Sequence, residues 1–226
     1  MKKLFQPETR RESNRTNGWI GTDESGKGDY FGPLVVAGVY VRNSQDEKRL
    51  EEIGTRDSKK ISDRRIIELA RTIKEKFINS IVLIGPERYN QLYEKLKNLN
   101  RILAWAHARV IENILERVEC SYAITDQFGD KNYVLNALMR KGKNIYIHQQ
   151  PGAEEDLAVA AASILARAEF LKKIDSLSQE IGVNLLKGSS REVENLAREL
   201  VKNKGKEILN RITKRHFKIT RKILGD

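Results

Sequence analysis

The chain has 226 residues, enough for one domain with a sizeable core, and its length does not require a second domain. Lys and Arg outnumber Asp and Glu by 42 to 31, giving a formal net charge of +11 that favours a polyanionic partner but also fits the charged surface of a thermophilic protein. The chain has no run of about 18 apolar residues, its start lacks the apolar core of a secretory signal, and its single cysteine excludes an internal disulfide, so we expect a soluble, cytoplasmic protein with no membrane association.

β-rich runs open the ordered part of the chain. The first 17 residues are polar and basic without periodicity, so we expect a flexible arm over 1–17 and one folded domain over 18–226. The runs at 19–23 and 33–41 flank a glycine-rich connection, which predicts an antiparallel strand pair. Three further strands are predicted at 78–85, 121–126 and 143–148.

Helical patterns lie between and after these strands. A helix is predicted from Ser62, a favourable N-cap, and a second over 100–118, where apolar residues recur at helical spacing. The alanine-rich stretch from 154 to 174 predicts a central buried helix. The segment 191–224 is helical with basic turns at 202–206 and 214–218, which we expect on the partner-binding side. These elements predict an α/β fold, a mixed five-stranded sheet flanked by helices with a helical C-terminal segment.

Acidic residues stand where two strands end. Asp23 and Glu24 close the first strand, and Asp126 closes the strand at 121–126. Neighbouring strand residues point to opposite faces, so both acids of the first pair reach one site only if the chain turns at once, which Gly26 and Gly28 permit. Because strand ends gather functional groups, we expect these acids to lie together.

A third acidic group, Glu154, Glu155 and Asp156, precedes the predicted buried helix. At least one of these acids is explained by the helix dipole, since negative charge stabilises a helix N-terminus. Carboxylates without clustered Cys or His suit Mg²⁺ or Mn²⁺ rather than zinc. Two such ions would relieve the repulsion among four acids and could clamp the attacking and leaving oxygens of a phosphodiester.

Several long motifs resemble one family, the type 2 ribonucleases H, and most closely its ribonuclease HIII branch. The resemblance spans roughly Trp19 to the C-terminus, and its motifs are GTDESGKGDYFGPLVVAGV (21–39), DSKKIS (57–62), YNQLYEKLKNLNRILAWAH (89–107), TDQF (125–128) and AVAAASILAR (158–167). It implies a ribonuclease H-like fold and a monomeric endonuclease that cleaves the RNA strand of RNA/DNA hybrids with two Mg²⁺ or Mn²⁺ ions, leaving 5′-phosphate and 3′-hydroxyl ends.

The resemblance assigns catalytic metal ligands to Asp23, Glu24 and Asp126, and it favours Glu154 as the fourth. Glu154 lies three residues before Leu157, whereas ribonuclease HIII has a spacing of four. Glu155 and Asp156 therefore stay alternatives.

The resemblance also implies contacts with the hybrid. The GKG motif is similar to a family loop whose backbone approaches the scissile ribonucleotide, where a 2′-hydroxyl separates RNA from DNA. Asn98 is alternatively a helix cap, and we expect His107 to be a packed residue supporting the site rather than a ligand. The expected substrate-binding residues are Gly26, Lys27, Gly28, Ser58, Lys59, Lys60, Asn98, Asn100 and Lys187.

Two departures from the family remain. Ser189 follows the late KG pair where ribonuclease HII has a tyrosine that senses a lone ribonucleotide, which favours the HIII branch. Ribonuclease HIII usually carries a folded N-terminal substrate-binding domain, and 17 residues are too few to form one, so we expect affinity to depend on the basic arm and the C-terminal helices.

Three alternative functions stay open besides the hybrid-cleaving endonuclease. They are excision of single embedded ribonucleotides as in ribonuclease HII, a catalytically silent hybrid-binding module, and a less specific metal-dependent nuclease.

Overall fold

The computed structural model describes residues 17–55, 61–126 and 131–225. Ser58, Lys59, Lys60 and nearly all of the expected basic arm lie outside the described residues. No helix within the described ranges is long and apolar enough to cross a membrane.

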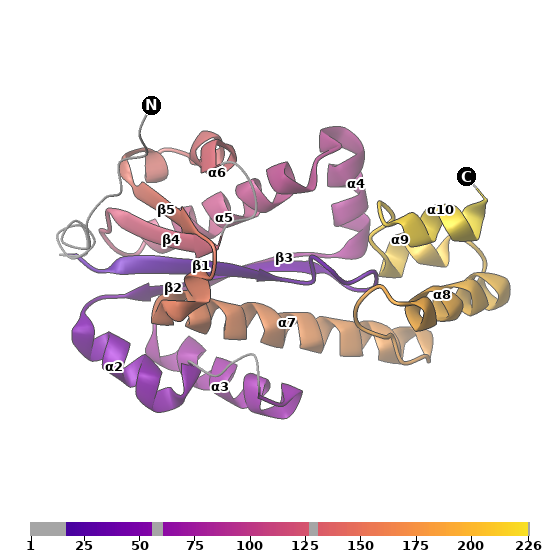
Figure 1. The fold of residues 1–226 in the computed structure, drawn as a ribbon, viewed down its shortest axis with the longest axis horizontal. Coiled ribbons are helices and arrows are strands. Elements are labelled where there is room, and N and C mark those ends of the chain that lie inside the picture. Colours follow the sequence, from indigo (N-terminus) through magenta and orange to yellow (C-terminus); the bar gives the residue numbers. More distant parts are fainter. Residues whose placement is uncertain (1–16, 56–60, 127–130, 226) are drawn as a thin grey trace.

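A mixed five-stranded sheet forms the centre of the molecule, in the order β3-β2-β1-β4-β5 (Figure 1). The antiparallel part consists of β1 (Trp19–Ser25), β2 (Leu34–Val41) and β3 (Asn79–Ile84). The parallel part adds β4 (Tyr122–Asp126) beside β1 and β5 (Tyr146–Gln150) beside β4. The predicted five strands and the mixed sheet are confirmed.

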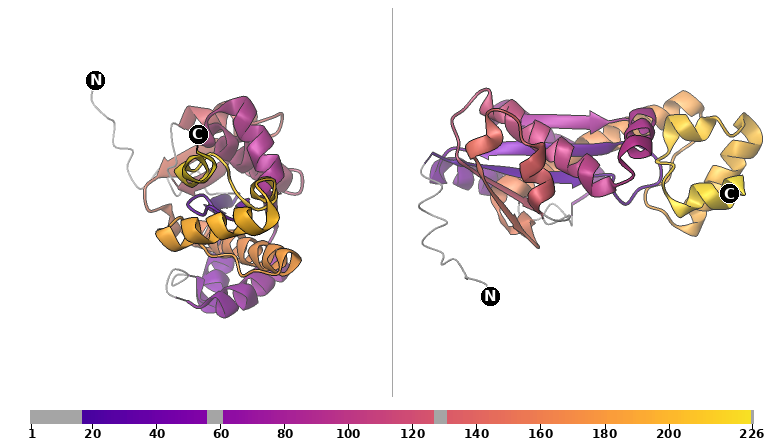
Figure 2. Two further views of the ribbon diagram at one scale, coloured as in Figure 1. Left: turned by 90° about the vertical axis from the view of Figure 1, so that its right-hand side faces the viewer. Right: turned by 90° about the horizontal axis from the view of Figure 1, so that it is seen from above.

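Helices cover both faces of this sheet (Figures 1 and 2). One face carries α2 (Ser44–Ile53), α3 (Asp63–Lys76) and α7 (Leu157–Ile181), and the other carries α4 (Pro86–Leu96), α5 (Leu99–Leu115) and α6 (Lys131–Ala137). Short 3₁₀ turns at η2 (Gly142–Asn144) and η3 (Ala153–Glu155) flank β5. Two buried apolar clusters, one on each side of the sheet, form the core.

The predicted central helix starts later and runs further than its sequence pattern indicated. Residues 153–155 form the 3₁₀ turn η3, and α7 begins at Leu157 because the Asp156 side chain caps it, accepting from the N–H groups of Ala158 and Val159. Fifteen of its 25 residues are buried. The first turn packs directly on β1, since a Cβ added at Gly21 would lie 2.2 Å from the carbonyl carbon of Ala158. This contact sets the height of α7 above the acidic end of β1.

The C-terminal helices α8 (Arg191–Lys204), α9 (Ile208–Ile212) and α10 (Lys218–Leu224) lie at one end of the molecule (Figure 1). They are anchored by Lys214, a residue of the predicted basic turn 214–218 that is buried rather than exposed to a partner. Its Nζ donates to the carbonyls of Phe31, Gly32 and Pro33 at 3.3, 2.8 and 3.3 Å. Burial lowers the pKa of Lys214, but three carbonyl acceptors require the three donors of the charged ammonium.

Candidate active site

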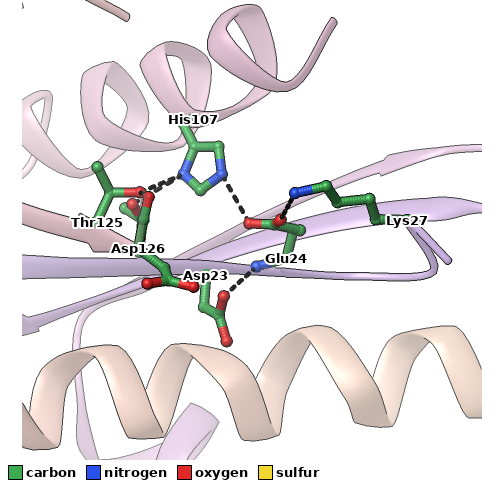
Figure 3. A network of polar contacts seen from close by, with 7 residues as sticks. Asp23, Glu24, Lys27, His107, Thr125 and Asp126 are labelled. Atoms are coloured by element: carbon green, nitrogen blue, oxygen red, sulfur yellow. Dashed lines mark hydrogen bonds and ion pairs between the residues drawn. The ribbon is translucent and has the colours of Figure 1, made fainter. Parts of the chain in front are cut away.

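Asp23 and Glu24 point to opposite faces of the sheet. We expected the chain to turn directly after this pair, but β1 continues in register with β2 through Ser25, so the alternation of a strand separates the two carboxylates. The turn comes at Gly26, whose φ of 88° suits glycine. A Cβ added there would lie 2.2 Å from the Pro33 carbonyl oxygen. Figure 3 shows Asp23 directed toward α7 and Glu24 toward α5.

Asp126 joins Asp23 because β4 runs parallel beside β1, with Thr125 in register with Thr22. Figure 3 shows the two aspartates side by side, both directed toward α7. The backbone N–H of Glu24 donates to Asp23 Oδ1 at 2.8 Å, and the hydroxyl of Ser163 in α7 also hydrogen-bonds to the Asp23 carboxyl. Burial, together with the negative charges of Glu24 and Asp126, nevertheless raises the pKa of Asp23 to about 7. No cationic side chain contributes to this shift in the pKa of Asp23.

Glu24 is held on the other face by two basic side chains (Figure 3). The fully buried His107 of α5 donates through Nε2 to Glu24 Oε2 at 3.3 Å, and Lys27 Nζ lies 3.3 Å from Oε1. The His107 Nδ1 lies 2.9 Å from the Thr22 hydroxyl and 3.4 Å from that of Thr125. Burial alone would raise the pKa of Glu24, but the hydrogen bond and charge of His107, with Lys27, lower it. The expectation that His107 supports the site agrees with this geometry.

The three acids at 154–156 have different environments. The N–H of Ala153 donates to Asp126 Oδ1 at 3.5 Å, which brings η3 to the end of β4 beside the aspartate pair. Glu154 follows and is partly buried, whereas Glu155 is exposed. Asp156 is engaged as the cap of α7 and also accepts from Trp19 Nε1 at 3.1 Å. Asp156 thus has a structural role, and Glu154 is the better placed candidate ligand.

The acids fit hard divalent cations by charge and by donor type. All four candidates offer oxygen ligands, and the raised pKa of Asp23 reflects a position that a cation would stabilise. Within the described ranges, no three His, Cys, Asp or Glu side chains already converge in a metal-binding arrangement. Among the candidates, Glu24 is turned toward His107 and Lys27 and away from the aspartates.

The GKG loop lies beside these acids, with Gly26 buried, Lys27 partly buried and Gly28 exposed. A Cβ added at Gly28 would meet no atom within 4 Å, so packing within the described protein does not demand glycine there. An exposed backbone without a side chain leaves room for the close approach of a ligand. The loop is tied to the predicted KG pair: the N–H of Gly188 donates to Asp29 Oδ1 at 2.6 Å, and the N–H of Tyr30 donates to the Gly188 carbonyl at 2.8 Å.

Two of the other predicted contact residues, Asn98 and Lys187, have side-chain partners within the protein. Asn98 caps α5 by accepting from the N–H groups of Asn100 and Arg101, as the alternative prediction held. Lys187 Nζ lies 2.7 Å from Asp63 Oδ2, and Arg167 binds the other oxygen of the same carboxylate at 2.8 Å. The structure thus brings Lys187 to the start of α3, shortly after the DSKK motif, whose Ser58, Lys59 and Lys60 lie outside the described residues.

Three residues at the site had not been selected from the sequence. Ser163 hydrogen-bonds to Asp23, Thr22 to His107, and Asp29 to the Gly188 amide. Ser163 offered a signal, as the one hydroxyl in the apolar stretch 157–166, and so did Thr22, which directly precedes Asp23 in the strand. Asp29 gave no comparable signal, because its partner lies far away along the chain.

Comparisons with known proteins agree with the fold and assign the chain to a family. A family model described as Ribonuclease HII matches residues 20–220. A protein named Ribonuclease HIII from Protochlamydia amoebophila is 48% identical over 206 residues, which cover 91% of this chain and 68% of that protein. A Ribonuclease HIII from Chlamydia pneumoniae is 46% identical over 201 residues, covering 88% and 67%.

Solved structures are similar over nearly the whole chain. The crystal structure of Bst-RNase HIII in complex with Mn²⁺ has a TM-score of 0.85 and 30% identity, covering 95% of this chain and 71% of that one. Aquifex aeolicus RNase H3 has a TM-score of 0.73 and 29% identity, covering 93% and 79%.

Proposed function

The chain belongs to the ribonuclease HII family of metal-dependent endonucleases, and from this premise we propose that it hydrolyses the RNA strand of RNA/DNA hybrids with two divalent ions, as a monomer of the ribonuclease HIII type, leaving 5′-phosphate and 3′-hydroxyl ends. The supporting observation is the partly buried Asp23 beside Asp126, a pair whose negative charge lacks a compensating cation within the described protein.

Asp23, Glu24, Asp126 and Glu154 would hold the ions, which supply an activated water and stabilise negative charge on a phosphodiester. The hydrogen bond from Ser163 and the amide of Glu24 fix the Asp23 carboxyl. His107 keeps Glu24 ionised and oriented from the opposite face. Lys27, which forms an ion pair with Glu24 beside this site, would be a phosphate contact.

The substrate would approach through the glycine loop and its neighbours. The exposed backbone at Gly28 allows contact with a ribose 2′-hydroxyl, and Lys27 and Lys187 lie on two loops joined by hydrogen bonds. Asn100 at the start of α5 is a further proposed contact, with Asn98 holding that helix end in place. Ser58, Lys59 and Lys60 are proposed to bind phosphate. Recognition would then depend on hybrid shape and 2′-hydroxyls.

The proposal is tested with Asp126→Asn on an end-labelled RNA/DNA hybrid in Mg²⁺ and in Mn²⁺. We expect hybrid binding to persist and cleavage to be lost, because one anionic ligand is removed and the side-chain shape is kept. Glu155→Gln, which removes the same charge from an exposed position in the neighbouring segment, should cleave at the wild-type rate. Extension of the products by a DNA polymerase would report 3′-hydroxyl ends. Undiminished cleavage by Asp126→Asn contradicts the assignment, and binding without cleavage by the wild type supports the silent module.

A further inference from the structure

An acidic side chain stands among the loops proposed to meet the hybrid. Asp29 directly follows the GKG motif, is partly buried, and is neither a candidate metal ligand nor a cation. A carboxylate close to a phosphate backbone weakens binding, because like charges repel. Since its charge alone opposes the ligand, any contribution of Asp29 to recognition has to come from its contacts within the protein.

The Asp29 side chain joins two connections that are far apart in the sequence. These are the connection between β1 and β2 and the connection between α7 and α8, which lie side by side (Figure 1). Asp29 Oδ1 accepts from the N–H of Gly188 at 2.6 Å, and the N–H of Tyr30 donates to the Gly188 carbonyl at 2.8 Å. Two consecutive residues thus hold both backbone polar groups of Gly188. The bond to Asp29 is the stronger of the two, because an ionised acceptor strengthens a hydrogen bond.

Two open backbone segments flank this contact. A Cβ added at Gly28 or at Gly188 would meet no atom within 4 Å, so the described protein leaves space beside both glycines. Asp29 directly follows Gly28 and binds Gly188, and this one side chain therefore sets the separation of the two segments. Backbone with free space around it allows N–H and carbonyl groups to approach a ribose 2′-hydroxyl, the group that separates RNA from DNA.

The neighbouring Lys187 is held less firmly. Its Nζ lies 2.7 Å from Asp63 Oδ2, but the two side chains are 52% and 41% exposed, and exposed ion pairs contribute little to stability. The hydrogen bond from Gly188 to Asp29 is partly buried and joins a carboxylate to rigid backbone. Asp29, rather than Asp63, is therefore the side chain that fixes the KG pair relative to the GKG loop.

Asp29 combines an acceptor oxygen with a negative charge, and these two properties act on different groups. The acceptor binds the amide of Gly188. The charge acts on the buried Lys214, because burial lowers the pKa of that lysine and Asp29 raises it. Asparagine keeps the acceptor and removes the charge, whereas alanine removes both. The two substitutions therefore separate a role in positioning from a role in charge.

We propose that Asp29 is a positioning residue for hybrid recognition, which holds Gly188 at the separation from the GKG loop that lets both segments contact one hybrid. This inference rests on the proposed function, since it names a residue that arranges the substrate-binding loops of the same site. It implies that loss of the Asp29 side chain weakens hybrid binding, although a negative charge is removed beside a polyanion. Electrostatics alone predicts the opposite sign.

The test compares Asp29→Ala and Asp29→Asn in the full chain with a control, Asp175→Ala, which makes the same substitution at an exposed position of α7. Each variant raises the formal net charge from +11 to +12. Thermal unfolding verifies that each variant is folded. Affinities for an RNA/DNA hybrid and for a DNA duplex of the same sequence are measured by fluorescence anisotropy with Ca²⁺ in place of Mg²⁺, and KM and kcat on the hybrid are measured in Mg²⁺.

We expect Asp29→Ala to bind the hybrid roughly tenfold more weakly, as for the loss of one hydrogen bond to a charged group, with a higher KM and an unchanged kcat. Its affinity for the DNA duplex should not fall, so its preference for the hybrid should decrease by the same factor. Asp29→Asn should restore most of the hybrid affinity, and the control should bind at least as tightly as the wild type, because positive charge favours a polyanion.

Three results would overturn the inference. They are equal or tighter hybrid binding by Asp29→Ala, an equal loss of affinity for the hybrid and the DNA duplex, and an Asp29→Asn variant that binds as weakly as Asp29→Ala. A wild type that binds the hybrid but never cleaves it refutes the proposed function, while the affinities of the same variants still decide the role of Asp29.

Discussion

Asp23→Asn should inactivate the protein and stabilise its metal-free form. In the folded chain, burial and the negative charges of Glu24 and Asp126 raise the pKa of Asp23 from 3.8 to about 7. The folded state therefore holds a proton that the unfolded state releases above pH 4, and stability falls as pH rises from about 4 to 7 and then levels off. This difference in pKa between the folded and unfolded states corresponds to a loss of folding stability of roughly 4 kcal/mol at most. Asparagine removes this cost and keeps an oxygen for the Glu24 amide and Ser163.

The assay is thermal unfolding in EDTA at pH 8 and at pH 5. At pH 8 the melting temperature of Asp23→Asn should exceed that of the wild type by several degrees, about 3 °C for each kcal/mol. At pH 5 the difference should shrink, because the wild-type carboxyl is then protonated. Saturating Mn²⁺ should reverse the order at pH 8, since only the wild type retains this ligand. A metal-free variant no more stable than the wild type at pH 8, or a gain of the same size at pH 5, would refute the reasoning.

Three further predictions concern other residues. Glu154→Gln should lower kcat strongly in Mg²⁺, while Asp156→Ala should keep kcat and lose about 1–2 kcal/mol of stability in urea unfolding, because a helix cap is removed; the opposite pattern would make Asp156 the ligand. Lys214→Met should lower the free energy of unfolding by roughly 2–4 kcal/mol, because three carbonyls lose their donor, and a loss below about 0.5 kcal/mol would contradict the anchoring role. A DNA duplex with one embedded ribonucleotide should be cut far more slowly than a continuous hybrid, because Ser189 stands where ribonuclease HII has its sensing tyrosine; robust cutting 5′ to that ribonucleotide would favour the HII type.

The sequence predicted the strands well because they are dense in β-branched and apolar residues between clear turn signals. It predicted the start of α7 poorly. Acids at 154–156 suit the first turn of a helix, yet residues 153–155 form a 3₁₀ turn. The helix begins only at Leu157, because the Asp156 side chain caps its N-terminus and the N–H of Ala153 donates to Asp126. In the basic turn at 214–218, Lys214 differs from the predicted exposure, because a lysine with three carbonyl acceptors can be buried, and those acceptors lie about 180 residues away.

The sequence by itself determined the fold class and the family, and it predicted the acids of the site, since strand patterning and motifs can be read along the chain. Only the tertiary structure decided how those acids are arranged. Strand alternation directs Asp23 and Glu24 to opposite faces, and the parallel pairing of β1 with β4 brings Asp126 to Asp23. Desolvation of Asp23, together with the negative charges of Glu24 and Asp126, is what raises the pKa of Asp23, and these effects depend on separations in space that no spacing along the chain can supply.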